Sequence, residues 1–286
     1  MIRPSDGEWI PGDFYFFLNY CPILKITKKD KSKKRGEYVT DFPDVWEGHY
    51  YKFHYLHQAR EAGKHGIELA SRSKGKSLTA AALLSKRFVL GESDTVNKNV
   101  TCYATAQDRK YLDAGNQTLN KFQLIIDHLA NNTEFPRKRL LSSLNNMQWT
   151  MGYVDLDTGT RCGTQNSVIG ISTKDDESKL RGTRGVLYIM EEAGSMPRLL
   201  QLWNNLLPSV EYGEDTFGLL FAFGTAGDSQ SDFYAMSEMM YHPLGYHIYS
   251  MDNIYDIAGK GGKEFGYFFP GYLNLSNCYD SCYRYH

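Results

Sequence analysis

The sequence predicts an α/β fold with a mainly parallel central sheet flanked by helices, and three observations support this prediction. First, short apolar and aromatic runs have the length and continuity of strands that are buried on both faces. These runs lie at 67–70, 100–104, 167–172, 186–190 and 217–223. Second, segments with helical periodicity alternate with them, at 76–90, 111–129 and 196–210. Third, 42% of the 286 residues are hydrophobic, which is enough for a sizeable core.

The chain divides into three parts by composition. Residues 1–66 form an aromatic-rich N-terminal extension, residues 67–250 carry the alternating strands and helices, and residues 251–286 form a C-terminal segment. Within the extension we expect a strand over Asp13–Leu24, and a second strand or a helix over Val39–Tyr55. The basic run at 28–35 suits either a solvated hairpin loop or a contact with phosphates, and both interpretations stay open.

A glycine, a lysine and a serine lie between the first predicted core strand and the first predicted core helix. Gly75 lets the backbone approach a phosphate, Lys76 supplies a cation, and Ser77 offers a hydroxyl to Mg²⁺ at the start of the helix. The usual pattern is G-x-x-x-x-G-K-[ST], and here an alanine takes the place of the first glycine. The predicted nucleotide-binding loop, or P-loop, consists of Ala70, Ser71, Arg72, Ser73, Lys74, Gly75, Lys76 and Ser77.

Two adjacent carboxylates end the apolar strand at 186–190. Side chains of neighbouring strand residues point to opposite faces, but where the backbone turns at the end of a strand both can reach one site. We expect Glu191 to hold Mg²⁺, directly or through water, and Glu192 to orient and deprotonate the water that attacks a γ-phosphate. The alternative is an acidic pair on the surface at a strand end.

The strand at 217–223 ends in small and hydroxyl-bearing residues, Gly224-Thr225-Ala226-Gly227. Thr225 has the place and the chemistry to lie beside a γ-phosphate, although a tight turn would use the same residue types. The order of the P-loop, a strand ending in Glu-Glu and a strand ending in Gly-Thr is typical of P-loop ATPases with an additional central strand.

Three further residues are candidates for contacts with ATP. Arg72 lies within the P-loop and has reach toward a γ-phosphate. Arg181 lies on a predicted loop before the Glu-Glu strand, where it could approach a neighbouring subunit's nucleotide. For each arginine, pairing with a nearby carboxylate is the alternative. Gln58, among aromatic residues shortly before the P-loop, could hydrogen-bond adenine, although core packing explains the aromatic residues equally well.

Composition excludes some other classes of protein. No apolar segment reaches the ~18–20 residues that span a bilayer, and the N-terminus lacks a signal-peptide core, so we expect a cytoplasmic protein that does not enter a membrane. The five cysteines show no zinc-binding spacing. The net charge of −1 gives no overall attraction to nucleic acid, so DNA would be met by a local basic face or by a ring of copies.

The P-loop with a non-glycine first position resembles that of the large terminase subunit of tailed bacteriophages. Arg181-Gly182, about ten residues before the acidic pair, and the turn at 224–227 resemble further motifs of that family. The opening residues 7–13 and 17–20 are similar to those of gut-phage members.

This resemblance implies an ATPase motor that drives double-stranded DNA into a procapsid in the host cytoplasm. It implies ATP and Mg²⁺ as cofactors, portal protein and small terminase subunit as partners, and a ring of about five copies. Lys76, Ser77, Glu191 and Glu192 would act as above, with Arg181 as a finger acting in trans.

The chain departs from the family pattern in two respects. Glu191 stands where the family usually has aspartate, and the clustered carboxylates of a C-terminal nuclease are lacking, since only Asp256, Glu264 and Asp280 lie near the end. We therefore expect no nuclease activity. A helicase-like DNA-remodelling ATPase and a non-catalytic nucleotide-binding fragment of a packaging protein remain as alternatives.

Overall fold

The computed structural model describes residues 9–26, 38–92, 99–174, 176–213, 215–225, 230–251 and 266–269. The described α-helices are α1 (Gly12–Tyr20), α2 (Glu47–Glu61), α3 (Lys76–Leu90), α4 (Lys110–Asp113), α5 (Thr118–Asn132), α6 (Leu199–Val210) and α7 (Gln230–Tyr241). Short 3₁₀ helices are η1 (Glu177–Leu180), η2 (Ala193–Ser195) and η3 (Pro243–Tyr246). No described helix has the length and apolar character that crossing a membrane requires.

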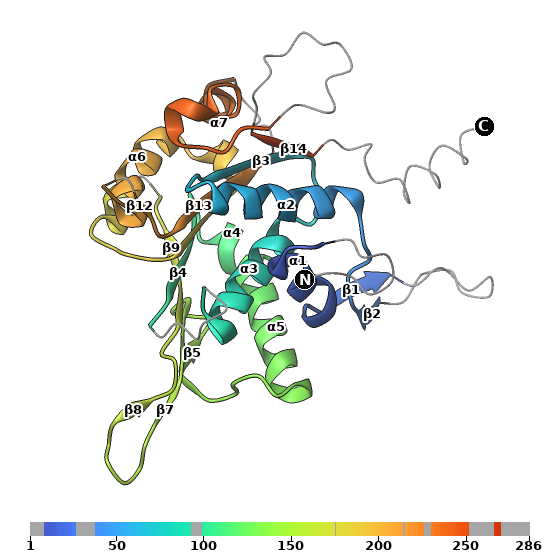
Figure 1. The fold of residues 1–286 in the computed structure, drawn as a ribbon, viewed down its shortest axis with the longest axis vertical. Coiled ribbons are helices and arrows are strands. Elements are labelled where there is room, and N and C mark those ends of the chain that lie inside the picture. The colour runs from blue at the N-terminus through green and yellow to red at the C-terminus, as the bar shows by residue number, and fades with distance from the viewer. Residues whose placement is uncertain are drawn as a thin grey trace, which may run out of the picture.

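An eight-stranded sheet forms the centre of the molecule (Figure 1). Its strands are β3 (Gly66–Ala70), β4 (Thr101–Ala106), β5 (Arg139–Ser143), β6 (Gln148–Met151), β9 (Ser167–Ser172), β10 (Leu187–Glu191), β13 (Leu219–Gly224) and β14 (Tyr267–Phe269). Two-stranded ribbons lie outside it: β1 (Ile23–Ile26) with β2 (Tyr38–Asp41), β7 (Tyr153–Val154) with β8 (Arg161–Cys162), and β11 (Glu211–Tyr212) with β12 (Asp215–Thr216).

The strand order of the sheet is β14-β3-β13-β10-β4-β9-β6-β5. Every pair from β14 to β9 is parallel, and the last two pairs of the described sheet, β9–β6 and β6–β5, are antiparallel. The prediction of a mainly parallel sheet is confirmed. Because β13 lies between β3 and β10, one strand separates the P-loop from the Glu-Glu strand, as the additional-strand class of P-loop folds requires.

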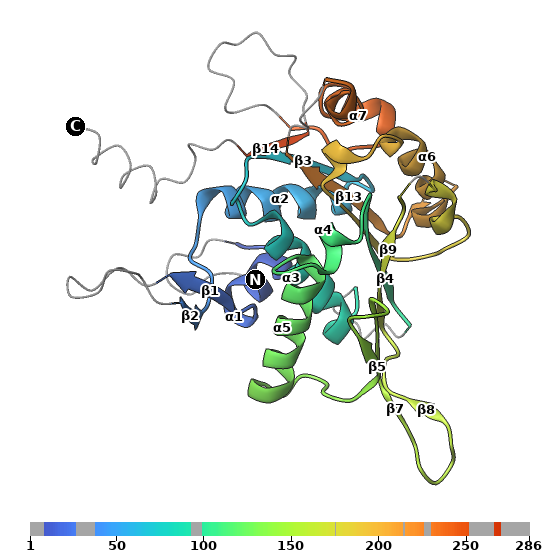
Figure 2. The ribbon, with the colours of Figure 1, turned by 180° about the vertical axis from the view of Figure 1, so that it is seen from behind.

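Helices cover both faces of the sheet, as Figures 1 and 2 show. Helices α3 and α5 pack against each other on one face, α1 packs on α3, and α2 packs on α1 and on strands β3 and β14. Helices α6 and α7 cover the other face, where α6 contacts β13 and α7 contacts β3. Strands β10 and β13 are buried throughout, which explains why both are continuous apolar runs in the sequence.

The N-terminal extension differs from its prediction. The strand expected over Asp13–Leu24 is helix α1 followed by β1, whereas the segment Val39–Tyr55, predicted as a strand or a helix, contains most of β2 and the first part of α2. Aromatic residues favour strands by propensity, but here Phe14 and Phe17 lie one helical turn apart and both rings pack on Phe53 of α2, with centroids 5.3 and 5.1 Å away. Tertiary packing therefore decided the local structure.

Charged side chains bind the extension to the core. Asp13 of α1 contacts Lys86 at 2.7 Å and Arg87 at 3.3 Å, both on α3. Glu92, just after α3, pairs with the buried Arg87 at 2.5 Å and with Arg60 of α2 at 2.7 Å. The Arg87 and Lys86 charges hold the pKa of the buried Asp13 carboxyl well below its usual range, against the effect of burial.

Within the core, several predicted boundaries are confirmed and others move. Helix α3 and strand β9 have the predicted ends, whereas the helix predicted over 111–129 is two helices, α4 and α5, with Gly115 in a left-handed conformation between them. The antiparallel strands β5 and β6, the projecting β7–β8 ribbon and β14 were not predicted. Some of the predictions concern residues outside the described part of the chain: those for 1–8, 28–35, Ala226-Gly227, Asp256, Glu264 and Asp280, and for two of the five cysteines.

Candidate functional site

The P-loop joins the carboxyl end of β3 to the start of α3. Ser73 and Gly75 have positive φ angles of 62° and 72°, so the loop curls back over the helix start. The ammonium of Lys76, a largely buried side chain, lies inside this curl and donates to the carbonyls of Ala70 at 2.9 Å and Ser71 at 3.0 Å. The loop thus has the conformation and the enclosed cation that phosphate binding requires.

Helix α2 supports the P-loop from below. The buried imidazole of His49 is 3.2 Å from the carbonyl of Lys74. It is stacked on Trp46, with ring centroids 5.0 Å apart, and also contacts Phe17. Burial lowers the pKa of His49 to about 3, so the ring is neutral at ordinary pH. The neutral His49 ring, packed between Trp46 and Phe17, thus supports the loop from a fixed position.

The P-loop and the Glu-Glu strand meet at Ser77 and Glu191. The hydroxyl of Ser77 donates to Oε1 of Glu191 at 2.5 Å, although the two residues are 114 positions apart. Glu191 is the last residue of β10 and is 2% exposed. The two residues predicted to hold Mg²⁺ are therefore in direct contact.

Thr118 also binds Glu191, although no motif in the sequence predicts this contact. Its hydroxyl donates to Oε2 of Glu191 from the first residue of α5, where Thr118 is completely buried. Lys121, one turn further along α5, lies close enough for its charge to act on the carboxylate. A threonine at a helix start is common and belongs to no motif, so the sequence contains no specific signal for this contact.

The environment of Glu191 disfavours its charge. Burial is the main cause and the nearby Glu192 adds to it, while the hydroxyls of Ser77 and Thr118 and the charge of Lys121 oppose them. The net effect raises the pKa of Glu191 to about 7. A bound cation would supply the countercharge that this carboxylate lacks.

Glu192 turns the chain away from the sheet. It has the left-handed conformation, with φ 50° and ψ 46°, and its carbonyl accepts from the backbone N–H and the hydroxyl of Ser195, each at 2.8 Å. The turn lets a second carboxylate follow Glu191 at the same edge of the sheet. Oε2 of Glu192 accepts from the hydroxyl of Thr225 at 3.3 Å. Thr225 follows β13, the strand between β3 and β10, so both residues face the P-loop edge.

A buried ion pair lies behind the P-loop. Lys52 of α2 and Glu68 of β3 are 2.7 Å apart, and neither side chain is exposed. Burial lowers the pKa of Lys76, while the charges of Glu68, Glu192 and Glu191 oppose that effect. Three carboxylates therefore act on Lys76 and favour its charged form, which is the form that attracts phosphate.

The remaining predicted residues lie apart from this cluster. Ser71, Arg72 and Ser73 are exposed at the rim of the P-loop. Arg181 is exposed after η1, and its charge acts on Asp176, in keeping with the alternative of a loop arginine near a carboxylate. Gln58 is exposed on α2, nine residues beyond His49, about 13 Å further along the helix axis.

Oxygen atoms make up the donor set at the Ser77–Glu191 contact. Mg²⁺ prefers hard oxygen ligands and often takes only one or two from carboxylates, the rest coming from phosphates and water. The described residues contain no group of three or more His, Cys, Asp or Glu side chains that could hold a metal by themselves. The Ser77 hydroxyl and the Glu191 carboxylate are ligands of the type and number that Mg²⁺ takes from protein beside a phosphate.

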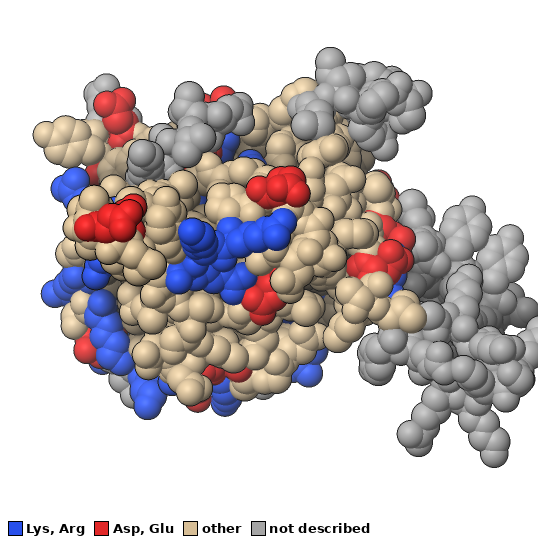
Figure 3. Space-filling view, turned by 90° about the horizontal axis from the view of Figure 1, so that it is seen from below, with Lys and Arg blue, Asp and Glu red and all other residues tan. Residues whose placement is uncertain are grey.

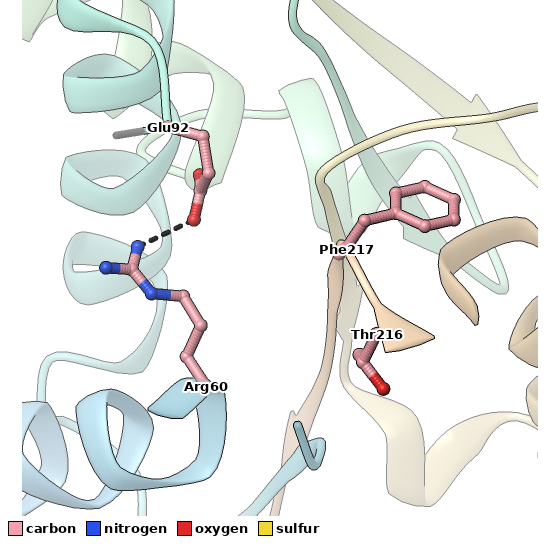
Figure 4. A pocket seen from close by; sticks show the side chains of 5 residues that line it. Arg60, Glu92, Thr216 and Phe217 are labelled. Atoms are coloured by element: carbon pink, nitrogen blue, oxygen red, sulfur yellow. Dashed lines mark hydrogen bonds and ion pairs between the residues drawn. The ribbon is translucent and has the colours of Figure 1, made fainter. Parts of the chain in front are cut away.

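A separate cavity of about 210 Å³ lies beside the residues that precede β13, at the amino end of that strand (Figure 4). It is lined by Arg60, Glu92, Thr216, Phe217 and Gly218. The guanidinium of Arg60 and the carboxylate of Glu92 bind each other at 2.7 Å on one side of it, opposite Thr216 and Phe217. Its charged groups already neutralise each other, so it has none of the features of the P-loop site.

No protein-family model matches the chain, and a search of curated proteins gives no match. Among solved structures, the chain is similar to the HK97 bacteriophage large terminase, with 14% sequence identity and a TM-score of 0.49, over 87% of this chain and 45% of that one. It is also similar to the large terminase of the thermophilic bacteriophage D6E, with 12% identity and a TM-score of 0.42, over 75% of this chain and 56% of that one. A structure of the D6E protein in complex with ADP gives 14% identity and a TM-score of 0.35, over 74% and 56% of the two chains. The chain thus spans about half the length of the phage large terminases it resembles, and the likeness concerns the fold.

Proposed function

We propose that the chain is a P-loop ATPase and that it serves as the motor subunit of a phage terminase, using ATP hydrolysis to move double-stranded DNA into a procapsid. The contact between Ser77 and Glu191 carries the ATPase part of the proposal. It joins the P-loop to an acidic strand end through the two residue types that hold Mg²⁺ beside a triphosphate. The packaging part rests on the resemblance of the motifs.

The roles of the side chains follow from their positions. Lys76 would turn from the carbonyls of Ala70 and Ser71 to the β- and γ-phosphates, and the loop N–H groups would bind the same phosphates. Ser77 and Glu191 would hold Mg²⁺, which on arrival with ATP neutralises phosphate charge. Thr225, bonded to Glu192, is placed to respond to the presence of the γ-phosphate.

Glu192 is the proposed general base. Its side chain is half-buried and accepts only one hydrogen bond from the described residues, that of Thr225. It would take the proton of a water molecule as the water oxygen bonds to the γ-phosphorus and the bond to the β–γ bridging oxygen breaks, releasing ADP. Arg181 and Arg72 remain proposed contacts to phosphate, the first acting from a neighbouring subunit.

Double-stranded DNA is the proposed polymer, with portal protein, small terminase subunit and a ring of about five copies as the proposed assembly in the host cytoplasm. One group of lysine and arginine side chains lies near the middle of the face seen in Figure 3, with aspartate and glutamate side chains around it, at the end of the molecule that carries the β7–β8 ribbon in Figure 1. A local basic face of this kind is what DNA binding needs in a chain whose net charge is −1.

ATP hydrolysis measured with and without double-stranded DNA tests the proposal. We expect Lys76→Ala to lose nucleotide binding, and Glu192→Gln to bind nucleotide while its turnover falls by a factor on the order of 10²–10⁴. Glu134→Gln, which changes a fully exposed carboxylate, is the matched control and should behave as wild type. Nucleotide binding that is unaffected by Lys76→Ala would contradict the assignment of the site, and turnover that survives Glu192→Gln would contradict the assigned base.

A further inference from the structure

Glu191 is held by two hydroxyl groups from two different helices. Ser77, at the start of α3, donates to Oε1, and Thr118, at the start of α5, donates to Oε2. Each carboxylate oxygen of Glu191 therefore accepts a hydrogen bond from a different hydroxyl. The two bonds together fix the orientation of the carboxylate plane.

The second anchor matters because glutamate is a long side chain. It has one more rotatable bond than aspartate, so a single bond from Ser77 would leave the carboxylate free to rotate about it. Glu191 is 2% exposed and Thr118 is not exposed at all, so bulk water does not reach this contact to replace the hydroxyl.

Thr118 is itself rigidly placed. The next residue, Leu119, and Phe122 one turn later are fully buried, which fixes the start of α5 against the sheet. A β-branched side chain in a helix has few available rotamers. The hydroxyl thus meets Glu191 from a fixed direction.

From this geometry we propose that Thr118 is a positioning residue, which orients the Glu191 carboxylate for Mg²⁺ while Ser77 and Oε1 face the nucleotide. The inference rests on the proposed function, since it assumes that Glu191 serves a Mg²⁺–nucleotide complex. Partners that orient a metal ligand typically change metal affinity by about 10–100-fold when they are removed.

The affinity for ADP, measured in Mg²⁺ and again in EDTA, tests this role without requiring turnover. Thr118→Val keeps the shape of the side chain and removes the hydroxyl, and Thr118→Ser keeps the hydroxyl. We expect Thr118→Val to reduce the Mg²⁺-dependent gain in affinity at least tenfold and to leave the affinity in EDTA unchanged. Thr118→Ser should retain the wild-type gain within about twofold.

A double-mutant cycle with Glu191→Asp provides a second readout. The shorter aspartate cannot reach both hydroxyls, so Thr118→Val should have little further effect on the Mg²⁺-dependent gain in that background. An equally large effect of Thr118→Val in both backgrounds would overturn the inference, because the threonine would then act other than through the carboxylate.

The outcomes separate this inference from the proposed function. A wild-type chain that binds no nucleotide in Mg²⁺ overturns the proposed function, and the inference with it. Mg²⁺-dependent binding that Thr118→Val leaves unchanged overturns the inference alone. Equal losses in Thr118→Val and Thr118→Ser, together with weaker binding in EDTA, would show that Thr118 serves packing and would also overturn it.

Discussion

The imidazole of His49 occupies the space that a side chain at Gly75 would need. A Cβ atom built on Gly75 would lie 2.6 Å from Nε2 of His49, and the ring cannot retreat because Trp46 and Phe17 enclose it. Two features therefore require a glycine at position 75: its left-handed φ of +72°, and the His49 ring of α2, which leaves no space for a side chain.

Replacement of Gly75 by alanine tests both requirements. The left-handed conformation alone costs about 1–2 kcal/mol of folding free energy in an alanine, and the contact with His49 adds to it. Gly159→Ala is the matched control, since Gly159 has a φ of +68° and nothing within 4 Å of its Cβ position. Urea denaturation should show a clearly larger loss of unfolding free energy for Gly75→Ala than for Gly159→Ala. Equal losses would mean that the His49 ring can move away from the added methyl group.

Because the pair Lys52–Glu68 is buried, we expect a substitution of one partner to reduce the unfolding free energy much more than a substitution of both. Glu68→Gln removes the carboxylate charge that faces the buried Lys52 ammonium at 2.7 Å and should cost about 3–5 kcal/mol of unfolding free energy. The double variant Lys52→Met/Glu68→Leu should recover most of that loss. Urea midpoints of the two variants give the comparison, and a Glu68→Gln midpoint close to wild type would contradict the prediction.

Glu191 should make the stability of the nucleotide-free protein depend on pH. The pKa of Glu191 is about 7 in the folded chain, against an ordinary value of 4.5 that applies to the unfolded chain. Between these pH values Glu191 is therefore ionised in the unfolded chain and still protonated in the folded chain. The contribution of Glu191 is therefore complete below pH 4.5 and is lost as pH rises through about 7, by about 3 kcal/mol in total.

Glu191→Gln, which cannot titrate, isolates this contribution from those of Lys76, Lys121 and Glu192, the charged groups around it. The unfolding free energy of wild type relative to the variant should fall from pH 5 to pH 8. A relative stability that is flat or rises over this interval would show that Glu191 is ionised throughout in the folded protein.

The anchoring of α1 predicts that the N-terminal extension unfolds together with the core. Asp13→Asn removes the charge that faces Lys86 and Arg87 and should cost about 3 kcal/mol of unfolding free energy in a single transition. Asp44→Asn is the control, because the Asp44–Lys25 pair is largely exposed and worth less than about 1 kcal/mol. Calorimetry would contradict this coupling between the extension and the core if it showed two separate unfolding transitions.

Two exposed cations precede β5 at the basic end of the molecule, Arg137 and Lys138. If they contact DNA phosphates, Arg137→Ala/Lys138→Ala should weaken DNA binding equally for all sequences and reduce the slope of log affinity against log salt by about 2. Lys64→Ala/Lys110→Ala removes the same charge elsewhere and should not change the slope. Fluorescence anisotropy over a salt series distinguishes the two pairs.

The core of the fold could be predicted because its signals are local. Helix α3 and strand β9 have the predicted ends, and the buried strands β10 and β13 are apolar runs that only a two-sided parallel sheet explains. The extension could not be predicted in the same way. The aromatic residues of α1 satisfy strand propensity, and only the packing of Phe14 and Phe17 on α2 makes them helical.

The residues of the candidate site also divide into those with a local sequence signal and those that depend on tertiary packing. Lys76, Ser77 and Glu191 come from contiguous motifs, and the fold brings them together as their motifs predict. Thr118 and His49 reach the site from helices whose sequences contain no corresponding motif, so only the tertiary arrangement reveals them. The contacts that Gln58, Arg72 and Arg181 make with a nucleotide stay predictions.

Strand β14 gives the P-loop strand a neighbour on its outer side. Its three residues pair with Glu68, Leu69 and Ala70, the last residues of β3, and the hydroxyl of Tyr267 donates to the carbonyl of Gly48 at 2.6 Å. Without β14, the backbone groups of β3 on that side would be free to pair with a strand of another molecule, which is the usual route to edge-to-edge aggregation. Among the described residues the outer edge of the sheet is thus a three-residue strand instead of the strand that leads into the P-loop, and a very short edge strand is a poor template for pairing.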